Sequence, residues 1–182
     1  MRKVILSIIL LILTATLASC SNGGTGMGIL GDTDEKIADK TFDKIISAIR
    51  SNNDSKMIAM FSNSVKSKVD LSQSVLMFFD FIHGDIVSVS FASEAGVGAD
   101  YKSESGKKRK EIQSAFCIST TKNTYYIAVK ECVKDEIDDN NIGIVSIYII
   151  ESNNWKEDYV YRGDGKWIPG INIVYSFGTN QS

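Results

Sequence analysis

The spacing of apolar residues changes once along this chain, and that change sets the class of fold. Before Gly84 the apolar residues recur every three or four positions, as they do on one face of an α-helix. After Asp85 they alternate with polar residues, as they do in a strand that has one covered face. Helices followed by antiparallel strands are the α+β pattern. The sequence therefore predicts an α+β fold with three N-terminal helices packed on an antiparallel sheet of about four strands.

The three expected helices cover residues 32–50, 53–69 and 70–83. Each carries one apolar stripe, so each is expected to pack inward through a single face. Each also begins at a side chain that can accept hydrogen bonds from the first free backbone N–H groups. These caps are Asp32 for the first helix, Asn53 or Asp54 for the second, and Asp70 for the third.

The four expected strands are rich in β-branched and aromatic residues and cover 85–91, 112–120, 125–133 and 142–150. The last of these is apolar on both faces, which is typical of a central strand. The glycine-rich and polar segments between the first two strands are expected to form a loop. The second and third strands are expected to form a hairpin that turns at Lys122-Asn123.

Cys117 and Cys132 lie on the two strands of that hairpin. The expected register sets Cys117 opposite Ala128 and Cys132 opposite Gln113, several residues apart along the strands. A disulfide tolerates a Cα separation of at most about 7 Å. Both cysteines are therefore expected to carry free thiols.

The first twenty residues resemble the leader of a bacterial lipoprotein. Arg2 and Lys3 precede an apolar run that is too short to span a bilayer comfortably. The sequence LASC then resembles the lipobox, and this resemblance implies cleavage between Ser19 and Cys20 and attachment of palmitate-type acyl chains to the Cys20 thiol. Residues 1–19 would be the signal peptide, 20–31 a flexible glycine-rich tether, and 32–182 a single domain. The alternative is an ordinary secreted protein with an incidental cysteine.

The charge balance excludes some partners. The formal net charge is −2, and loss of Arg2 and Lys3 with the leader would make the chain more acidic. This gives no electrostatic case for nucleic-acid binding. We expect an extracytoplasmic domain held to the cell membrane by its N-terminal lipid.

The whole arrangement is similar to a known family. The lipobox, the order of helices and strands, and the late Trp167-Ile168-Pro169-Gly170-Ile171 segment resemble uncharacterised lipoproteins of gut-type Firmicutes, domain-of-unknown-function family 5104, over roughly residues 35–172. The order of elements also resembles the cystatin-like cone that nuclear transport factor two shares with ketosteroid isomerases and dehydratases. This resemblance implies a curved sheet with a concave pocket, and it implies no activity.

His83 is the only histidine, so the chain cannot assemble a multi-histidine metal site, and no metal or cofactor is expected. An enzyme hypothesis pairs His83 with Asp80, three residues earlier, as an oriented general base of the isomerase or dehydratase kind. The alternative is a histidine that favours a helix C-terminus because of the helix dipole.

Three further motifs have simple structural explanations. Arg162-Gly163-Asp164 spells an integrin-binding tripeptide, but a tight hairpin turn explains the same letters. The acidic run 135–141 lacks the spacing of a calcium loop and is expected to be a solvated turn. The basic run 107–110 is expected to open a strand, although it could also meet anionic wall polymers or lipid headgroups.

Aromatic residues gather in the second half of the chain, where they can fill a core or contact a ligand. Trp155 lies in a polar segment and is the strongest candidate for ligand contact there, and Phe79 is the candidate on the third helix. The preferred hypothesis is a non-enzymatic binding module. Its partner would be an envelope protein, a wall polymer or a small ligand, and a homodimer through the sheet is a further possibility.

Overall fold

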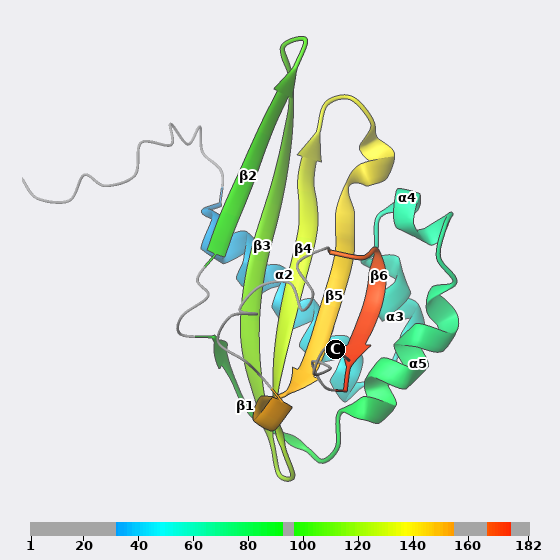
Figure 1. Ribbon diagram of the computed structural model, residues 1–182, viewed down its shortest axis with the longest axis vertical. Coiled ribbons are helices and arrows are strands. Elements are labelled where there is room, and N and C mark those ends of the chain that lie inside the picture. The colour runs from blue at the N-terminus through cyan, green and yellow to red at the C-terminus, as the bar shows by residue number, and fades with distance from the viewer. Residues whose placement is uncertain (1–31, 93–96, 155–166, 176–182) are drawn as a thin grey trace, which may run out of the picture. The chain divides into compact units, whose positions relative to one another are not determined.

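A computed structural model describes residues 32–92, 97–154 and 167–175. The expected leader, the tether with Ser19 and Cys20, the Trp155 site and the 162–164 tripeptide lie outside these residues. The described part is α+β, as expected, and it holds four α-helices and a six-stranded mixed sheet (Figure 1). The helices are α2 (Asp34–Arg50), α3 (Asp54–Ala59), α4 (Asn63–Lys66) and α5 (Leu71–Phe81). The strands are β1 (Ile86–Phe91), β2 (Val97–Glu104), β3 (Lys107–Thr120), β4 (Thr124–Asp135), β5 (Gly143–Glu151) and β6 (Gly170–Val174).

The sheet is larger than the sequence predicted, and it is not wholly antiparallel. Its order is β1-β3-β4-β5-β6, and β2 pairs with β3 beyond β1 along the same edge. All pairs are antiparallel except β5 with β6. The expectation missed β2 because most of its residues are exposed, so no apolar alternation marks it. It missed β6 because that strand has only five residues.

The second expected helix is in fact two short helices separated at Met60–Ser62. Phe61 there forms a parallel bridge with Ile144 of β5. The N–H of Ser62 donates to the Ile144 carbonyl at 3.0 Å, and the N–H of Ile144 donates to the Met60 carbonyl at 2.9 Å. These bonds pair backbone groups at the start of β5, where β6 does not reach. Ser62 also caps α4. Contacts remote in sequence thus override the local helical pattern.

Gly143 makes that close approach possible. Its φ is +123°, and a Cβ at this position would lie 2.8 Å from the Ser62 nitrogen and 2.9 Å from the Met60 oxygen. Those contacts are with backbone atoms, which cannot move aside as a flexible side chain can. Glycine is therefore required where the first residue of β5 passes the break between α3 and α4.

The helix caps agree with the sequence at two of three positions. Asn53 caps α3, and Asp70 caps α5. The first cap is Thr33 rather than Asp32, and the Thr33 side chain accepts from the Lys36 N–H at 3.3 Å. Asp32 is one residue too early for that role, and its carboxylate instead pairs with Lys36 and Lys40.

The β3–β4 hairpin turns one residue earlier than predicted. Cys117 lies opposite Tyr126, not Ala128. The N–H of Thr120 donates to the Asn123 carbonyl at 2.8 Å and closes the turn. The Thr120 hydroxyl also accepts from the Asn123 N–H at 3.0 Å. This local capping of the turn, which apolar alternation cannot reveal, sets the register.

The two cysteines on the hairpin are free. Cys132 lies opposite Glu111 rather than Gln113. Because Cys117 and Glu111 are both on β3, the cysteines are separated by about six residues of strand, or about 20 Å at roughly 3.3 Å per residue. That separation is far beyond the reach of a disulfide.

The core lies between one face of the sheet and the four helices, and α2 crosses that face diagonally (Figure 1). The Phe42 ring stacks on the Phe116 ring, with centroids 3.7 Å apart and planes 3° from parallel. Burying a large apolar side chain contributes about 1.5–3 kcal/mol to folding, so this layer supplies most of the driving force. The largest fully buried side chains are Tyr125, Phe61, Phe78, Phe116, Ile45, Met57, Ile112, Ile118, Ile127, Ile144, Ile147 and Ile149.

One acidic side chain lies inside this apolar layer. Glu131 of β4 is only 7% exposed and points toward α2, where its Oε2 accepts from the Thr41 hydroxyl at 2.8 Å. Its Oε1 has no hydrogen-bond partner among the described residues. Burial raises the pKa of Glu131 to about 7 from the ordinary 4.5, and the Thr41 bond and the Lys44 charge offset only part of that effect. The Glu131 carboxyl group, which β4 places beneath α2, therefore favours its neutral form more than an exposed glutamate does.

We predict that Glu131 makes the stability of the fold depend on pH. Between the unfolded pKa near 4.5 and the folded pKa near 7, the folded chain binds more protons than the unfolded one. The free energy of unfolding should therefore fall as pH rises through this window, by up to about 3 kcal/mol. Glu131→Gln keeps an acceptor for Thr41 but cannot ionise, so this variant should match the wild type near about pH 4 and exceed it near about pH 8.

Urea unfolding of the full chain at both pH values measures this effect. Glu35→Gln is the control, because Glu35 is an exposed acid on α2, the helix that packs over Glu131. Its pH profile should follow that of the wild type. Parallel profiles for Glu131→Gln and the wild type would show that Glu131 is ionised without cost in the folded protein.

Candidate functional site

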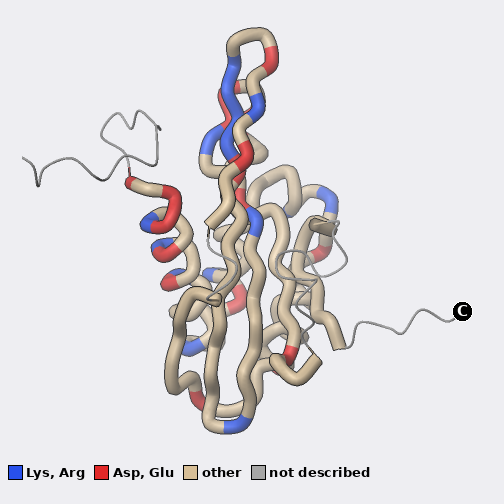
Figure 2. Tube along the Cα trace, turned by 60° about the vertical axis from the view of Figure 1, so that its left-hand side comes forward, with Lys and Arg blue, Asp and Glu red and all other residues tan. Residues whose placement is uncertain are grey.

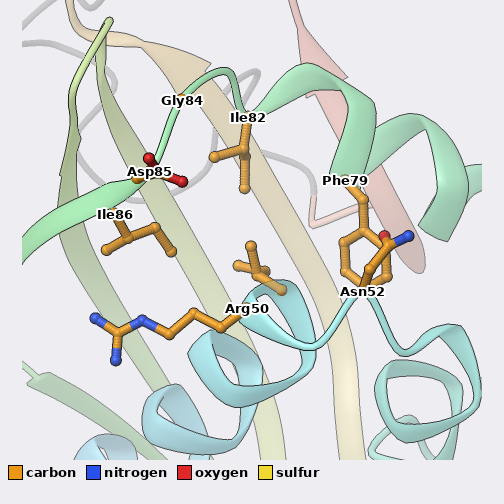
Figure 3. A pocket seen from close by; sticks show the side chains of 8 residues that line it. Arg50, Asn52, Phe79, Ile82, Gly84, Asp85 and Ile86 are labelled. Carbon is orange, nitrogen blue, oxygen red and sulfur yellow. The ribbon is translucent and has the colours of Figure 1, made fainter.

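A cavity of about 340 Å³ opens where α2 and α5 end and β1 begins (Figure 3). These three elements are brought together from separate parts of the chain, and the α5–β1 connection forms one wall of the cavity. The lining residues are Ile49, Arg50, Asn52, Phe79, Ile82, Gly84, Asp85 and Ile86.

The α5–β1 connection is held against the β3–β4 turn by hydrogen bonds to its backbone. The N–H of His83 donates to the Tyr125 hydroxyl at 2.9 Å, and the Thr120 hydroxyl donates to the His83 carbonyl at 2.6 Å. The Asp85 N–H donates to the Thr121 side chain at 3.1 Å, and the Asp85 carbonyl accepts from the Thr121 N–H at 2.9 Å. This wall of the cavity is therefore fixed in place rather than left as a free loop.

Gly84 allows the connection to lie this close to the turn. Its φ is +87°, which favours glycine, and a Cβ at this position would lie 2.6 Å from the Thr121 Oγ1. A side chain at Gly84 would push the connection away from the turn. The shape of the cavity thus depends on this glycine.

The lining combines an apolar surface with two opposite charges. The apolar part consists of three isoleucines and the Phe79 ring. Arg50 approaches from the end of α2 and Asp85 from the start of β1, on opposite sides of Ile86 (Figure 3). Both are exposed, and within the described residues neither side chain takes part in an ion pair or hydrogen bond. Among the described residues, therefore, neither charge is used within the fold.

Two helix C-termini also meet at this cavity. A helix carries a partial negative charge at its C-terminal end, where the last carbonyls have no partner within the helix. Arg50 lies in the last turn of α2 and compensates that end. The last turn of α5 contains no basic residue, and Asp85 follows shortly after it. The α5 side of the cavity therefore favours a positive group.

The site residues expected from the sequence fall in different places. Phe79 lines the cavity. His83 and Asp80 are exposed and are not among the lining residues, and no hydrogen bond joins their side chains. A general base at this site would need an imidazole in the cavity, whereas the bonds that His83 makes here come from its backbone. The structure thus does not assemble the expected pair.

Sequence reasoning missed Arg50 as a site residue. On α2 it looks like an ordinary basic residue near a helix C-terminus, and only the meeting of α2 with the α5–β1 connection places it at a cavity. The spacing of residues within one helix carries no signal for that meeting. Asp85 was not predicted as a site residue either, because the sequence marked it only as the point where the strand pattern begins.

Several charged residues at the far end of the sheet form ion pairs. Figure 2 shows acids and bases side by side on the β2–β3 hairpin and along α2. Glu111 is 4% exposed and accepts from Arg109 at 2.5 Å and from Lys130 at 3.0 Å. Burial opposes its ionisation, but these two cations outweigh burial and hold the pKa of Glu111 below its ordinary value. Lys110 pairs with Asp34.

The basic run 107–110 is therefore not a uniform positive patch, because two of its four residues form ion pairs with acids. The acidic run 135–141 forms a turn in which the Asp135 carboxylate accepts from the backbone N–H groups of Ile137 and Asp138. In the described ranges no group of three or more His, Cys, Asp or Glu residues is placed to hold a metal ion. In the same ranges no helix has the length and apolar character that crossing a bilayer requires.

Comparison with known proteins places the chain in a family. Residues 44–152 match the family described as Domain of unknown function (DUF5104). This span runs from the middle of α2 to the residue after β5 and includes all the described residues that line the cavity. A search of the curated proteins found no match. The chain therefore belongs to the DUF5104 family, as the resemblance in its sequence indicated.

Proposed function

We propose that this chain is a membrane-anchored bacterial surface lipoprotein whose domain binds a small ligand in the cavity between α2, α5 and β1. The observation that carries the proposal is the cavity itself, in which an apolar lining meets two opposite charges that have no partner among the described residues. Ligand sites in proteins are typically mainly apolar, with a few polar groups that fix orientation. Four of the eight described lining residues here are apolar, and polar groups make up most of the cavity's accessible surface.

The fixed wall of the cavity supports a binding role. The backbone bonds at His83 and Asp85 hold the α5–β1 connection on the β3–β4 turn before any ligand arrives. A site that is already ordered loses less conformational entropy on binding, so more of the contact energy appears as affinity. A role in binding also agrees with the exposed positions of His83 and Asp80, because an isomerase or dehydratase would need its base in the cavity.

The lipid anchor is supported by the residues around Cys20. The LASC sequence follows a short apolar run, and the glycine-rich segment after it suits a flexible tether. Each buried CH₂ of an acyl chain contributes about 0.8 kcal/mol, so two or three chains hold a polar domain on a membrane. We further propose that the domain is a cystatin-like cone of the kind found in nuclear transport factor two. The support for this proposal is that α2 packs across long antiparallel strands, as a helix does in that cone.

The anchor is tested with Cys20→Ser in the full chain, expressed in a bacterial host. The wild type should sediment with membranes and show acyl chains on its N-terminal peptide by mass spectrometry. The variant should lose the acyl mass and leave the membrane fraction, because the thiol that carries the lipid is gone. Cys117→Ser removes a thiol elsewhere and should behave as wild type. An unmodified Cys20 in the wild type would refute the anchor.

Ligand binding is tested by filling the cavity. Ile86→Trp places a bulky indole ring in the lining. Val87→Trp places the same ring at the next residue, which is 67% exposed and lies outside the lining. The wild type is screened by saturation-transfer NMR against small compounds that have an apolar body and are acidic, basic, neutral or zwitterionic. We expect some of these compounds to bind. Their signals should vanish for Ile86→Trp and persist for Val87→Trp.

Circular dichroism and urea unfolding verify that both variants are folded before they are compared. Signals that survive in a folded Ile86→Trp variant would place binding elsewhere on the molecule and overturn the proposed site. The absence of any signal from the wild type would do the same.

A further inference from the structure

We infer that the cavity takes a small zwitterion with an apolar body, of the amino-acid class, whose carboxylate faces Arg50 and whose ammonium group faces Asp85. The inference rests on the proposed function, because it names the ligand class of the same cavity. It is carried by the juxtaposition of two opposite charges, which form no ion pair with the described residues, across a lining that also holds apolar side chains.

The two charges define the number and sign of the groups that a ligand must carry. The Arg50 guanidinium can donate two parallel hydrogen bonds to a carboxylate, and the Asp85 carboxylate can accept from an ammonium group. A ligand with one charge would pair with one of them and leave the other without a partner on the ligand. A neutral ligand would satisfy neither. A molecule that carries both charges is the class that uses the whole site.

The helix ends fix which side of the cavity suits which charge. The α5 end has no basic residue in its last turn and is followed by Asp85, so it attracts the ammonium group. The α2 end is compensated by Arg50, which is the one positively charged residue among the described residues of the lining. A lone anion would face two helix C-termini and Asp85 with only Arg50 to hold it. The zwitterion avoids this conflict because its positive group faces the α5 side.

The apolar side chains of the lining indicate the chemistry of the uncharged part of the ligand. Phe79 and Ile82 come from α5 and its end, and Ile86 comes from the start of β1 (Figure 3). Ile49 of α2 also lines the cavity. These side chains suit an aliphatic or aromatic body. A volume of about 340 Å³ is at the small end of the range of roughly 300–1,000 Å³ for ligand sites. Leucine or phenylalanine fits this size, whereas a diacyl lipid or a polymer chain does not.

The test compares ligands that differ by one charge. L-leucine and L-phenylalanine are titrated by calorimetry into the full chain in lipid nanodiscs, with empty nanodiscs as the blank. N-acetyl-leucine lacks the ammonium group, and leucine amide lacks the carboxylate. Because both protein charges are exposed and screened by solvent, each loss should weaken binding by about fivefold.

Variants assign each charge to its partner. Asp85→Asn should weaken leucine binding and abolish the preference for leucine over N-acetyl-leucine. Arg50→Gln should weaken leucine binding and abolish the preference for leucine over leucine amide. Asp80→Asn and Lys56→Gln are the matched controls, because both remove an exposed charge outside the lining, and they should leave all four affinities unchanged.

Different failures have different meanings. If neither amino acid binds, but other compounds bind the wild type and lose their NMR signals in the Ile86→Trp variant, the ligand class is wrong and the cavity remains the binding site. Equal binding of leucine and N-acetyl-leucine, or equal binding of leucine and leucine amide, also overturns the ligand class. If the Ile86→Trp substitution abolishes the NMR signal of no compound in any class, the proposed function itself fails.

Discussion

The candidate site depends on the hydrogen bonds that fix the α5–β1 connection to the β3–β4 turn. Three side chains of the hairpin, Thr120, Thr121 and Tyr125, bond the backbone on both sides of Gly84. Since Gly84 lacks a Cβ, the two segments come close enough for these bonds to form. The end of α5 and the start of β1 are thereby placed over the end of α2, and the cavity is the half-open space between them.

The distribution of charge separates structural from functional residues. At the far end of the sheet Glu111 is buried and paired with Arg109 and Lys130, so these charges are used within the protein. Arg50 and Asp85 are exposed and take part in no such pair within the described residues. Pairing stabilises a fold but leaves nothing for a partner, whereas charges placed beside an apolar lining and left unpaired can select a ligand.

The sequence was informative where structure depends on near neighbours. The caps Asn53 and Asp70 and the apolar stripes of the helices could be predicted, because capping and helical periodicity act within a few residues. The break at Phe61 could not, since it depends on Ile144, far along the chain. Of the cavity, Phe79 could be predicted as a candidate contact, but its juxtaposition with residues of α2 and β1 arises only from the tertiary arrangement.

The central claim is that a small ligand binds at the junction of α2, α5 and β1. Backbone amide chemical shifts of the isotope-labelled full chain, recorded with and without L-leucine, test this claim most directly because they locate binding without any substitution. We predict that the perturbed amides cluster at 49–52, 79–82 and 84–86. Perturbations centred on the opposite face of the sheet, around Tyr126 and Tyr148, or the absence of perturbations at saturating leucine, would contradict the account.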